Sequence, residues 1–472
     1  MGASSKESTK LHIVMFPWFA YGHINPFIHL SKKLSSHNIQ ISFLSIPGNL
    51  SRIKSALHLN PPNQVIPLTI PPIEGLSPDF DSSSDVTPQT SELLKLALDQ
   101  MQPQVKTLLS QLKPQIILFD FAQHWLPSMA SELGIKAVSF CVFSAVASSY
   151  LTIPSRMSDP NKPPTIEDLK NPPQGYPKTS ITSMKTFQAQ DFLYLFKRFH
   201  GGIPVFQRIM GFTKACDAII YKTCTEIEGP YIDFMKKKLN KPLLLAGSAV
   251  PSPPSGELEQ SWANFFDKFP EKSVIFCNFG SETYLNDAQI KELTLGLEMT
   301  NMPFFLVLNF GSNNDDSDKK LEASLPQNFR ERVKERGVVH TGWVQQQLIL
   351  AHKSVGCYLN HSGFSSVIEG IVNDCQLAFI PQKGDQFLNS KLLSGDLKIG
   401  VEVNRRDEDG YFGKEDILEA IKTVMMDTDK EPCKSIRENH NKWRKFFLNK
   451  EVEDRYVENL VKELYYLAQK DE

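Results

Sequence analysis

Short, continuous apolar segments alternate along this chain with segments in which apolar residues recur at helical spacing. The first apolar segment, Leu11–Phe16, contains β-branched residues, and a second follows at Ile39–Ile46. Between them, Ile24–Ser36 carries apolar residues three to four positions apart. A buried strand, an amphipathic helix and another buried strand at this spacing predict a βαβ unit with parallel strands.

The same order of segments recurs twice further along the chain. Such repetition predicts an α/β protein made of two Rossmann-like, doubly wound domains that face a ligand cleft. The segments are a strand at Gln115–Phe119, a helix at Trp125–Leu133 and a strand at Ala137–Phe140, then a strand at Ser273–Asn278, a helix at Asp287–Glu298 and a strand at Pro303–Val307.

A Pro/Ser-rich tract separates the two halves. Gly247–Ser255 reads GSAVPSPPS, a composition typical of a linker. We expect an N-terminal domain over residues 1–246, a linker over 247–262, a C-terminal domain over 263–450 and a last helical segment over 451–472. Asn60–Pro72 and Ser155–Pro177 are proline-rich, so we expect loops and short helices there. The charged segment Glu451–Ala468 has helical periodicity.

Composition narrows the class of protein. Of 472 residues, 41% are hydrophobic and 22% charged, as in soluble globular proteins. The net charge of −2 argues against nucleic acid or an anionic membrane as a partner. No signal peptide or ~18-residue apolar span is found, so no stable membrane insertion is expected. Seven scattered cysteines indicate reduced thiols. We expect a cytoplasmic monomer.

One segment, residues 343–386, combines several residue types suited to a nucleotide sugar. Trp343 can stack on a base, and His361 can donate a hydrogen bond to phosphate oxygens. A helix is expected to begin near Gly363, and its N-terminal N–H groups favour a pyrophosphate. Glu369 lies four residues after Ser365, hence on the same helix face, where its carboxylate can accept from two ribose hydroxyls.

The segment resembles the plant secondary-product signature of family 1 UDP-glycosyltransferases, because W-x-x-Q, H-x-G-x-x-S, E and D-Q occur in order. The resemblance implies the GT-B fold, a UDP-sugar co-substrate, no further cofactor, and a chain end that crosses back to the N-terminal domain. It implies that Trp343 stacks on uracil, Gln346 contacts uridine, His361 and Ser366 hold the diphosphate, Glu369 binds the ribose, and Asp385 and Gln386 bind the donor sugar.

Further donor-site residues are expected around this skeleton. Gly280 and Ser281 follow a predicted strand, and a Gly-Ser turn there can present donors to phosphate, as it does in the family. Val344, Gly363 and Ser365 complete the predicted donor site. Ser365 stands where the commonest signature has Asn, so an amide donor is lost and the donor sugar stays open between glucose, xylose and rhamnose.

Transfer of a sugar to a hydroxyl needs a base. His23 lies in the first strand-to-helix turn, and histidine suits this task near neutral pH. Asp120 ends another predicted strand and could orient the imidazole, as the family resemblance also implies. His124 is a rival base, and a purely structural His23 capped by Asp120 is the alternative to catalysis.

The acceptor is less defined. Segments around both predicted catalytic residues and the start of the signature (PWFAYGHINPF, FDFAQHWLP, WVQQQLILAH) resemble the branch that extends a sugar on flavonoid or other phenolic glycosides. A simple aglycone such as a flavonol or terpenoid, or a UDP-sugar-binding protein without activity, are the alternatives. Aromatic residues near the base could stack on the acceptor or belong to the core. They are Trp18, Phe19, Tyr21, Phe121 and Trp125.

No metal is expected. Asp-x-Asp pairs, which bind metal and nucleotide sugar in another class of glycosyltransferase, lie here in hydrophilic stretches typical of solvated loops. They are Asp79/Asp81, Asp316/Asp318, Asp407/Asp409 and Asp427/Asp429.

Overall fold

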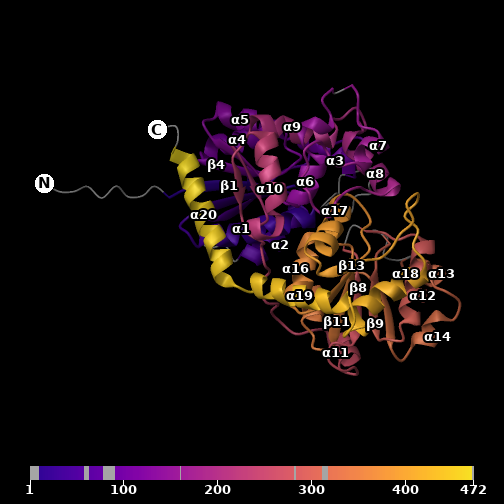
Figure 1. Cartoon of the computed structure of the whole chain (residues 1–472). Coiled ribbons are helices and arrows are strands. Elements are labelled where there is room, and N and C mark those ends of the chain that lie inside the picture. Colours follow the sequence, from indigo (N-terminus) through magenta and orange to yellow (C-terminus); the bar gives the residue numbers. More distant parts are fainter. Residues whose placement is uncertain are drawn as a thin grey trace.

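Two parallel sheets, each flanked by helices, build the molecule (Figure 1). The computed structural model describes residues 10–57, 63–77, 91–159, 161–280, 283–310 and 317–469. The fold class inferred from the sequence is confirmed, because both halves are doubly wound α/β units.

The first sheet has seven parallel strands in the order β3-β2-β1-β4-β5-β6-β7. Its strands are β1 His12–Phe16, β2 Gln40–Ser45, β3 Gln64–Pro67, β4 Ile116–Phe119, β5 Lys136–Cys141, β6 Ala218–Tyr221 and β7 Leu243–Leu245. The accompanying helices are α1 Tyr21–Ser35, α2 Pro47–Leu57, α3 Ser91–Gln100, α4 Gln102–Leu112, α5 Leu126–Glu132, α6 Ala145–Leu151, α7 Ile166–Lys170, α8 Thr186–Phe192, α9 Val205–Ala215 and α10 Thr225–Leu239, with 3₁₀ turns η2 Pro154–Arg156 and η3 Leu193–Phe196.

The second sheet has six parallel strands in the order β10-β9-β8-β11-β12-β13. Its strands are β8 Val274–Asn278, β9 Phe304–Leu308, β10 Gly337–Thr341, β11 Val355–Asn360, β12 Gln376–Phe379 and β13 Gly400–Glu402. The helices are α11 Gln260–Phe266, α12 Asp287–Met299, α13 Ser317–Ser324, α14 Phe329–Val333, α15 Gln346–Leu350, α16 Phe364–Val372, α17 Asp385–Lys391, α18 Lys414–Ile421, α19 Cys433–Phe447 and α20 Lys450–Gln469, with π-helical turns η5 Leu392–Asp396 and η6 Lys422–Met426.

The apolar runs of the sequence become strands because their side chains are buried on both faces of each sheet. All five residues of β1 and of β8 are buried. One expectation was wrong: within the proline-rich stretch Asn60–Pro72, residues 64–67 form the edge strand β3. Pro67 ends that strand, a position that proline tolerates because a sheet edge does not require its missing N–H. The stretch Ser155–Pro177 holds the short helix α7, as expected.

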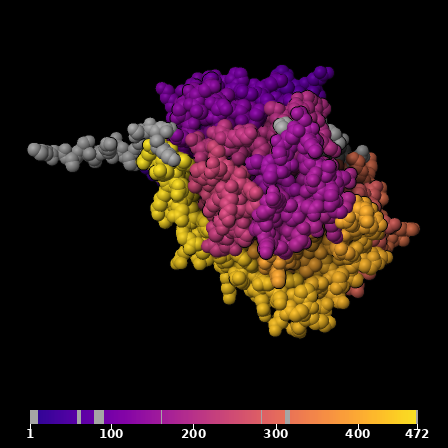
Figure 2. All heavy atoms as spheres, turned by 45° about the horizontal axis from the view of Figure 1, so that its top comes forward, coloured from indigo at the N-terminus to yellow at the C-terminus, as the bar shows by residue number. Residues whose placement is uncertain are grey.

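The last helix returns to the first sheet. Figures 1 and 2 show α20, in yellow, lying along the flank of the N-terminal half. Its buried apolar face shares a hydrophobic cluster with the strands and helix α1 of that half. Arg455 and Tyr456 also contact Glu226 of α10 over 2.8 Å and 2.6 Å. The end of the chain therefore packs on the half from which it is most distant in sequence.

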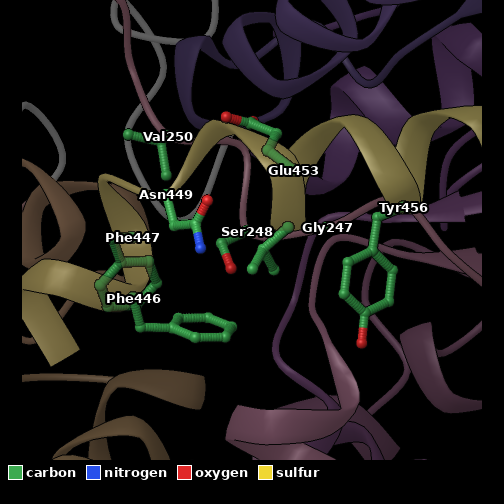
Figure 3. A pocket seen from close by; sticks show the side chains of 9 residues that line it. Gly247, Ser248, Val250, Phe446, Phe447, Asn449, Glu453 and Tyr456 are labelled. Carbon is green, nitrogen blue, oxygen red and sulfur yellow. The ribbon is translucent and has the colours of Figure 1, made fainter. Parts of the chain in front are cut away.

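The chain passes between the two halves twice, and the two passages lie together. Figure 3 shows Gly247, Ser248 and Val250 of the Pro/Ser-rich tract beside Phe446 and Phe447 at the end of α19. Gly247 has a φ of +77°, and a Cβ there would lie 3.2 Å from Cβ of Tyr456. The domain limits given above remain our proposal, with β7 ending at Leu245 and α11 beginning at Gln260.

No helix of the described ranges is both long and apolar enough to cross a membrane. All seven cysteines are free thiols, and all except the half-buried Cys141 are buried.

Candidate active site

In each sheet the strand order reverses at one point, and both candidate histidines lie there. The reversal falls between β1 and β4 in the first sheet and between β8 and β11 in the second. His23 and Asp120 follow β1 and β4, whereas Gly280 and His361 follow β8 and β11. The carboxyl edge at such a reversal is where open α/β sheets leave a crevice for ligands.

His23 and Asp120 form a close pair at the first reversal. Nδ1 of His23 lies 2.8 Å from Oδ2 of Asp120. A carboxylate can only accept, so Nδ1 carries the proton and Nε2 is left as the basic atom. The Asp120 side chain is 1% exposed and also accepts the N–H groups of Trp18 and Phe121, at 3.1 Å and 2.7 Å. These contacts fix the carboxylate, and the carboxylate orients the imidazole.

Two phenylalanines lie against His23. The ring centroids of Phe121 and Phe143 are each 5.3 Å from that of the imidazole. Phe143, in the turn after β5, was not predicted as a site residue, because only the fold brings it beside β1. Trp18 lies next to this group, with its ring 5.7 Å from that of Phe121.

The other predicted acceptor contacts differ in exposure. Phe19 has no exposed surface and packs on Trp18, so its side chain supports the loop from the core and cannot touch an acceptor in this structure. Trp125 is also buried, at 8% exposure. Tyr21 lies under the guanidinium of Arg52, 4.3 Å from its ring centroid. An aromatic residue near the base in sequence was therefore an unreliable sign of acceptor contact.

The rival base His124 belongs to another cluster. Its Nδ1 lies 3.1 Å from Nη1 of Arg208, which in turn pairs with Asp99 at 2.6 Å. Burial lowers the pKa of His124, with the Arg208 charge acting in the same direction. These contacts give His124 a structural role in holding α9 against the neighbouring loops.

Two glycines, Gly363 and Gly280, lie directly against the ring of His361. A Cβ at Gly363 would lie 2.4 Å from its Nε2, and one at Gly280 would lie 3.0 Å from its ring. Gly280 also has a φ of +78°, which L side chains rarely adopt. Nδ1 of His361 is buried and has no hydrogen-bond partner within the described ranges. Burial, reinforced by the charge of Lys383, lowers the pKa of His361 to about 4, so the ring is neutral near neutral pH.

Helix α16 begins beside the His361 ring, with Gly363 as its N-cap. Ser365 and Ser366 therefore occupy its first turn, where N–H groups lack intrahelical acceptors. Oγ of Ser365 accepts a 2.7 Å hydrogen bond from Nζ of Lys222, which comes from the first half of the chain. Lys222 was not singled out from the sequence. Ser281, which was also predicted as a donor-site residue, lies outside the described residues.

The Glu369 carboxylate is held by two glutamines. Nε2 of Gln346 donates to it over 2.6 Å and Nε2 of Gln347 over 3.1 Å, the second being a contact not predicted from the sequence. Burial raises the pKa of Glu369. Trp343, by contrast, is 81% exposed, so its face is open to a planar ring. Val344 is buried, and its carbonyl accepts the N–H of Gln346.

Asp385 begins α17 and faces the first half of the chain. Burial raises the pKa of Asp385, whereas Asn389, donating over 3.0 Å, and the charge of His23 lower it. Oε1 of Gln386 accepts the N–H groups of Gln382 and Lys383, which leaves its Nε2 to reach a ligand. Asp385, from the second half of the chain, therefore lies within electrostatic range of His23, from the first half.

The Asp-x-Asp pairs have other partners. Asp407 accepts from Thr186, Asp409 pairs with Arg406, and Asp427 pairs with Lys430. Asp79, Asp81 and Asp316 lie outside the described residues. Across the part of the chain that the structure describes, no three His, Cys, Asp or Glu side chains come together as a metal site requires.

Comparison with known proteins agrees with this architecture. The model of the UDP-glucuronosyl and UDP-glucosyl transferase family matches residues 319–442. An anthocyanidin-3-O-glucoside rhamnosyltransferase of Petunia hybrida is 56% identical over 458 residues, 97% of each chain. A UDP-glycosyltransferase of Glycine max is 53% identical over 98% of each chain. Among solved structures, UGT73P12 of Glycyrrhiza uralensis, complexed with glycyrrhetinic acid 3-O-monoglucuronide, superposes with a TM-score of 0.79 at 22% identity, covering 98% of this chain and 97% of that one.

Two paired Rossmann-like domains with facing carboxyl edges define the GT-B class of glycosyltransferases. Given its identity to curated relatives along almost its whole length, the chain belongs to the plant UDP-glycosyltransferase family.

Proposed function

We propose that this enzyme transfers a sugar from a UDP-sugar to a hydroxyl of the sugar already present on a flavonoid or similar phenolic glycoside, with inversion at the anomeric carbon. The observation that carries the proposal is the His23–Asp120 pair at the carboxyl edge of the first sheet, with Asp385 of the other domain near enough for a protonated His23 to act on it electrostatically. A base from one domain and a predicted sugar-binding carboxylate from the other then face the same reacting centre.

The chemistry follows from these positions. Nε2 of His23 removes the proton of the acceptor hydroxyl as its oxygen attacks the anomeric carbon. The bond between that carbon and the β-phosphate oxygen breaks, and UDP leaves with the electron pair. Asp120 stabilises the imidazolium that forms. The first-turn N–H groups of α16, His361 and Ser366 stabilise the charge that grows on the diphosphate.

Donor recognition is proposed for the residues inferred from the signature. The open face of Trp343 stacks on uracil, and Gln346 contacts the uridine. The Glu369 carboxylate, positioned by Gln346 and Gln347, accepts from the ribose hydroxyls. Asp385 and Nε2 of Gln386 bind hydroxyls of the transferred sugar. Gly280 and Gly363 leave room for His361 beside the phosphates.

The acceptor and the sugar are inferred from relatives. The Petunia protein is named for rhamnosyl transfer to anthocyanidin 3-O-glucoside, and relatives of 42% and 38% identity are named for xylosyl and glucosyl transfer to comparable glycosides. The highest of these identities favours UDP-rhamnose as the donor, ahead of UDP-xylose and UDP-glucose. Phe121 and Phe143, which are half-buried, offer an aromatic wall for the aglycone or its first sugar, and the buried Trp18 packs on Phe121.

A product assay tests both parts of the proposal. Purified enzyme is incubated with each of the three UDP-sugars and with flavonoids supplied in pairs, as free aglycone and as 3-O-glucoside. We expect the masses of products to show a deoxyhexose added to the glucosides only, and NMR to show the inverted anomer. Products from aglycones alone would support the alternative acceptor class. UDP-sugar binding without any product would support an inactive binding protein.

A cytoplasmic, monomeric enzyme remains part of the proposal. Sedimentation with and without UDP tests whether the enzyme is a monomer. A fluorescent fusion viewed in plant cells tests whether it is cytoplasmic.

A further inference from the structure

Lys222 is a buried cation placed between the two domains. It follows β6 at the carboxyl edge of the first sheet, and its side chain is 5% exposed. Its Nζ reaches Oγ of Ser365 in the first turn of α16, 2.7 Å away. A lysine of the acceptor-side domain therefore lies at the helix terminus where the proposed donor phosphates bind.

This position is unfavourable for a cation when no anion is present. The N-terminus of α16 carries partial positive charge, which repels an ammonium group. Burial lowers the pKa of Lys222 to about 8, against the opposing effects of Asp385, Glu369 and Glu228; Lys33 lowers it further. None of these carboxylates forms an ion pair with Nζ, so in the described part of the chain its hydrogen-bond acceptor is the uncharged Ser365 hydroxyl.

A neighbouring histidine also responds to the basic groups here. Burial lowers the pKa of His29 to about 4, and Lys222, Lys33 and Lys32 act in the same direction. A bound diphosphate would give the Lys222 ammonium the anionic acceptor that none of the nearby carboxylates provides by direct contact. An ammonium group with three donors, one of them on Ser365, can direct another to phosphate oxygen.

The side chain at position 365 determines which hydrogen-bond donors are present beside the proposed phosphate site. Ser365 replaces the Asn found in the commonest form of the signature, and it lacks the amide donor. The ammonium of Lys222 contacts that same hydroxyl, so a charged donor from the other domain lies beside a residue that has no amide donor of its own.

We propose that Lys222 is a donor-binding residue whose ammonium, positioned by Ser365, donates to the β-phosphate oxygens of the UDP-sugar. The inference rests on the proposed function, since it presupposes the diphosphate at α16. Charge grows on the β-phosphate as UDP leaves, so the contact strengthens in the transition state and raises kcat as well as donor affinity.

The test compares UDP with UMP, which lacks the β-phosphate. Isothermal titration measures both ligands on the wild type, Lys222→Met, Lys222→Arg and Lys236→Met, the last replacing an exposed lysine of α10. We expect Lys222→Met to weaken UDP binding about 10- to 100-fold, the range for a hydrogen bond to a charged group, and to leave UMP binding within about threefold. Lys222→Arg keeps the charge and most of the affinity. Lys236→Met changes neither ligand.

Two further measurements separate phosphate binding from a structural contact. Ser365→Ala removes the contact between domains but not the charge, so it should weaken UDP less than Lys222→Met does. In the wild type, affinity for UDP relative to UMP should fall as the pH rises through about 8, because Lys222 then loses its proton. This measurement needs no variant to fold.

Equal losses for UDP and UMP, an unchanged UDP affinity, or a UDP-to-UMP ratio independent of pH would overturn the assignment and leave Lys222 as a structural bridge. A wild-type protein that binds neither nucleotide would instead refute the proposed function on which the assignment rests.

Discussion

The two site histidines both lie where the strand order of a parallel sheet reverses, but they follow different strands of that reversal and have different surroundings. His23 follows β1 and donates from Nδ1 to the buried carboxylate of Asp120. His361 follows β11, its Nδ1 has no partner in the described residues, and its pKa is lowered to about 4 by burial. A neighbouring carboxylate fixes the orientation of the first ring, whereas burial keeps the second ring neutral near neutral pH. The same residue type at the carboxyl edge of each sheet is thus suited to the two roles proposed above, a base in one domain and a neutral hydrogen-bond donor in the other.

The largest effect expected from this comparison concerns the base. His23→Ala should lower kcat by about 10²–10⁴, the usual contribution of a positioned general base. Steady-state kinetics with saturating UDP-sugar measure it, and titration with UDP should show unchanged nucleotide binding. His124→Gln serves as the matched control, because His124 lies in the Arg208 cluster. Equal losses in both variants would remove the distinction between His23 and its rival.

Replacement of the neutral donor should act differently. His361→Ala should lower kcat/KM for the UDP-sugar about 10- to 100-fold, the range for a hydrogen bond to a charged group. His361→Gln keeps a neutral N–H donor and should recover part of that loss. His23→Gln should recover nothing, because an amide cannot act as a base. Rescue of both histidines, or of neither, would contradict the contrast.

The glycines beside the two histidines sharpen the comparison without removing either ring. A Cβ at Gly363 would lie 2.4 Å from Nε2 of His361, whereas a Cβ at Gly22, next to His23, would meet nothing within 4 Å. Gly363→Ala should displace the imidazole and weaken UDP binding about tenfold, which corresponds to roughly 1.4 kcal/mol. Gly22→Ala should leave UDP binding and kcat unchanged. Isothermal titration with UDP and steady-state kinetics on both variants test this difference.

The smallest effect concerns stability. Burial holds the pKa of His361 near 4, below its unfolded value of 6.5, so the unfolded chain binds the proton first. The contribution to stability is complete above about pH 6.5 and is lost as the pH falls toward 4, by about 1 kcal/mol per pH unit. Chemical unfolding of the wild type and His361→Gln from pH 7 to 5 measures it.

His29 and His440, also held near 4 by burial, add to the wild-type slope. The His361→Gln variant should therefore show a shallower slope, not a flat one. An unchanged slope would show that His361 titrates normally in the folded protein.

Local periodicity predicted most of the elements that carry the site. β1, β4 and β8 begin or end within a residue or two of their predicted limits because their apolar runs are buried on both sides, and α12 does so because one face of the helix is buried. The strand β3 was missed because its neighbouring prolines resemble those of a loop, and an edge strand tolerates them. The His23–Asp120 pairing was predictable, since both residues follow strands of one parallel sheet and such strands end at the same edge.

Contacts between distant segments could not be read in this way. Phe143 reaches His23 only because β5 and β1 share a sheet, and Lys222 meets Ser365 across 143 residues of sequence. Phe19 shows the opposite error, because closeness to the base in sequence does not separate a core ring from a ligand-facing one. Sequence motifs located the donor segment, and the fold supplied what surrounds it.

The paired passages between the two halves set a rule for building chimeras. Because α20 packs on the first sheet, an N-terminal half cut from this chain at the Pro/Ser-rich tract would lose part of its own hydrophobic cover. A hybrid that takes its donor half from a relative should therefore exchange the interior stretch between Val250 and Asn449, with both splice points at the passages seen in Figure 3, and keep the native tail. The donor half is in this sense inserted into the first half, and the two passages between them are the places at which it should be exchanged.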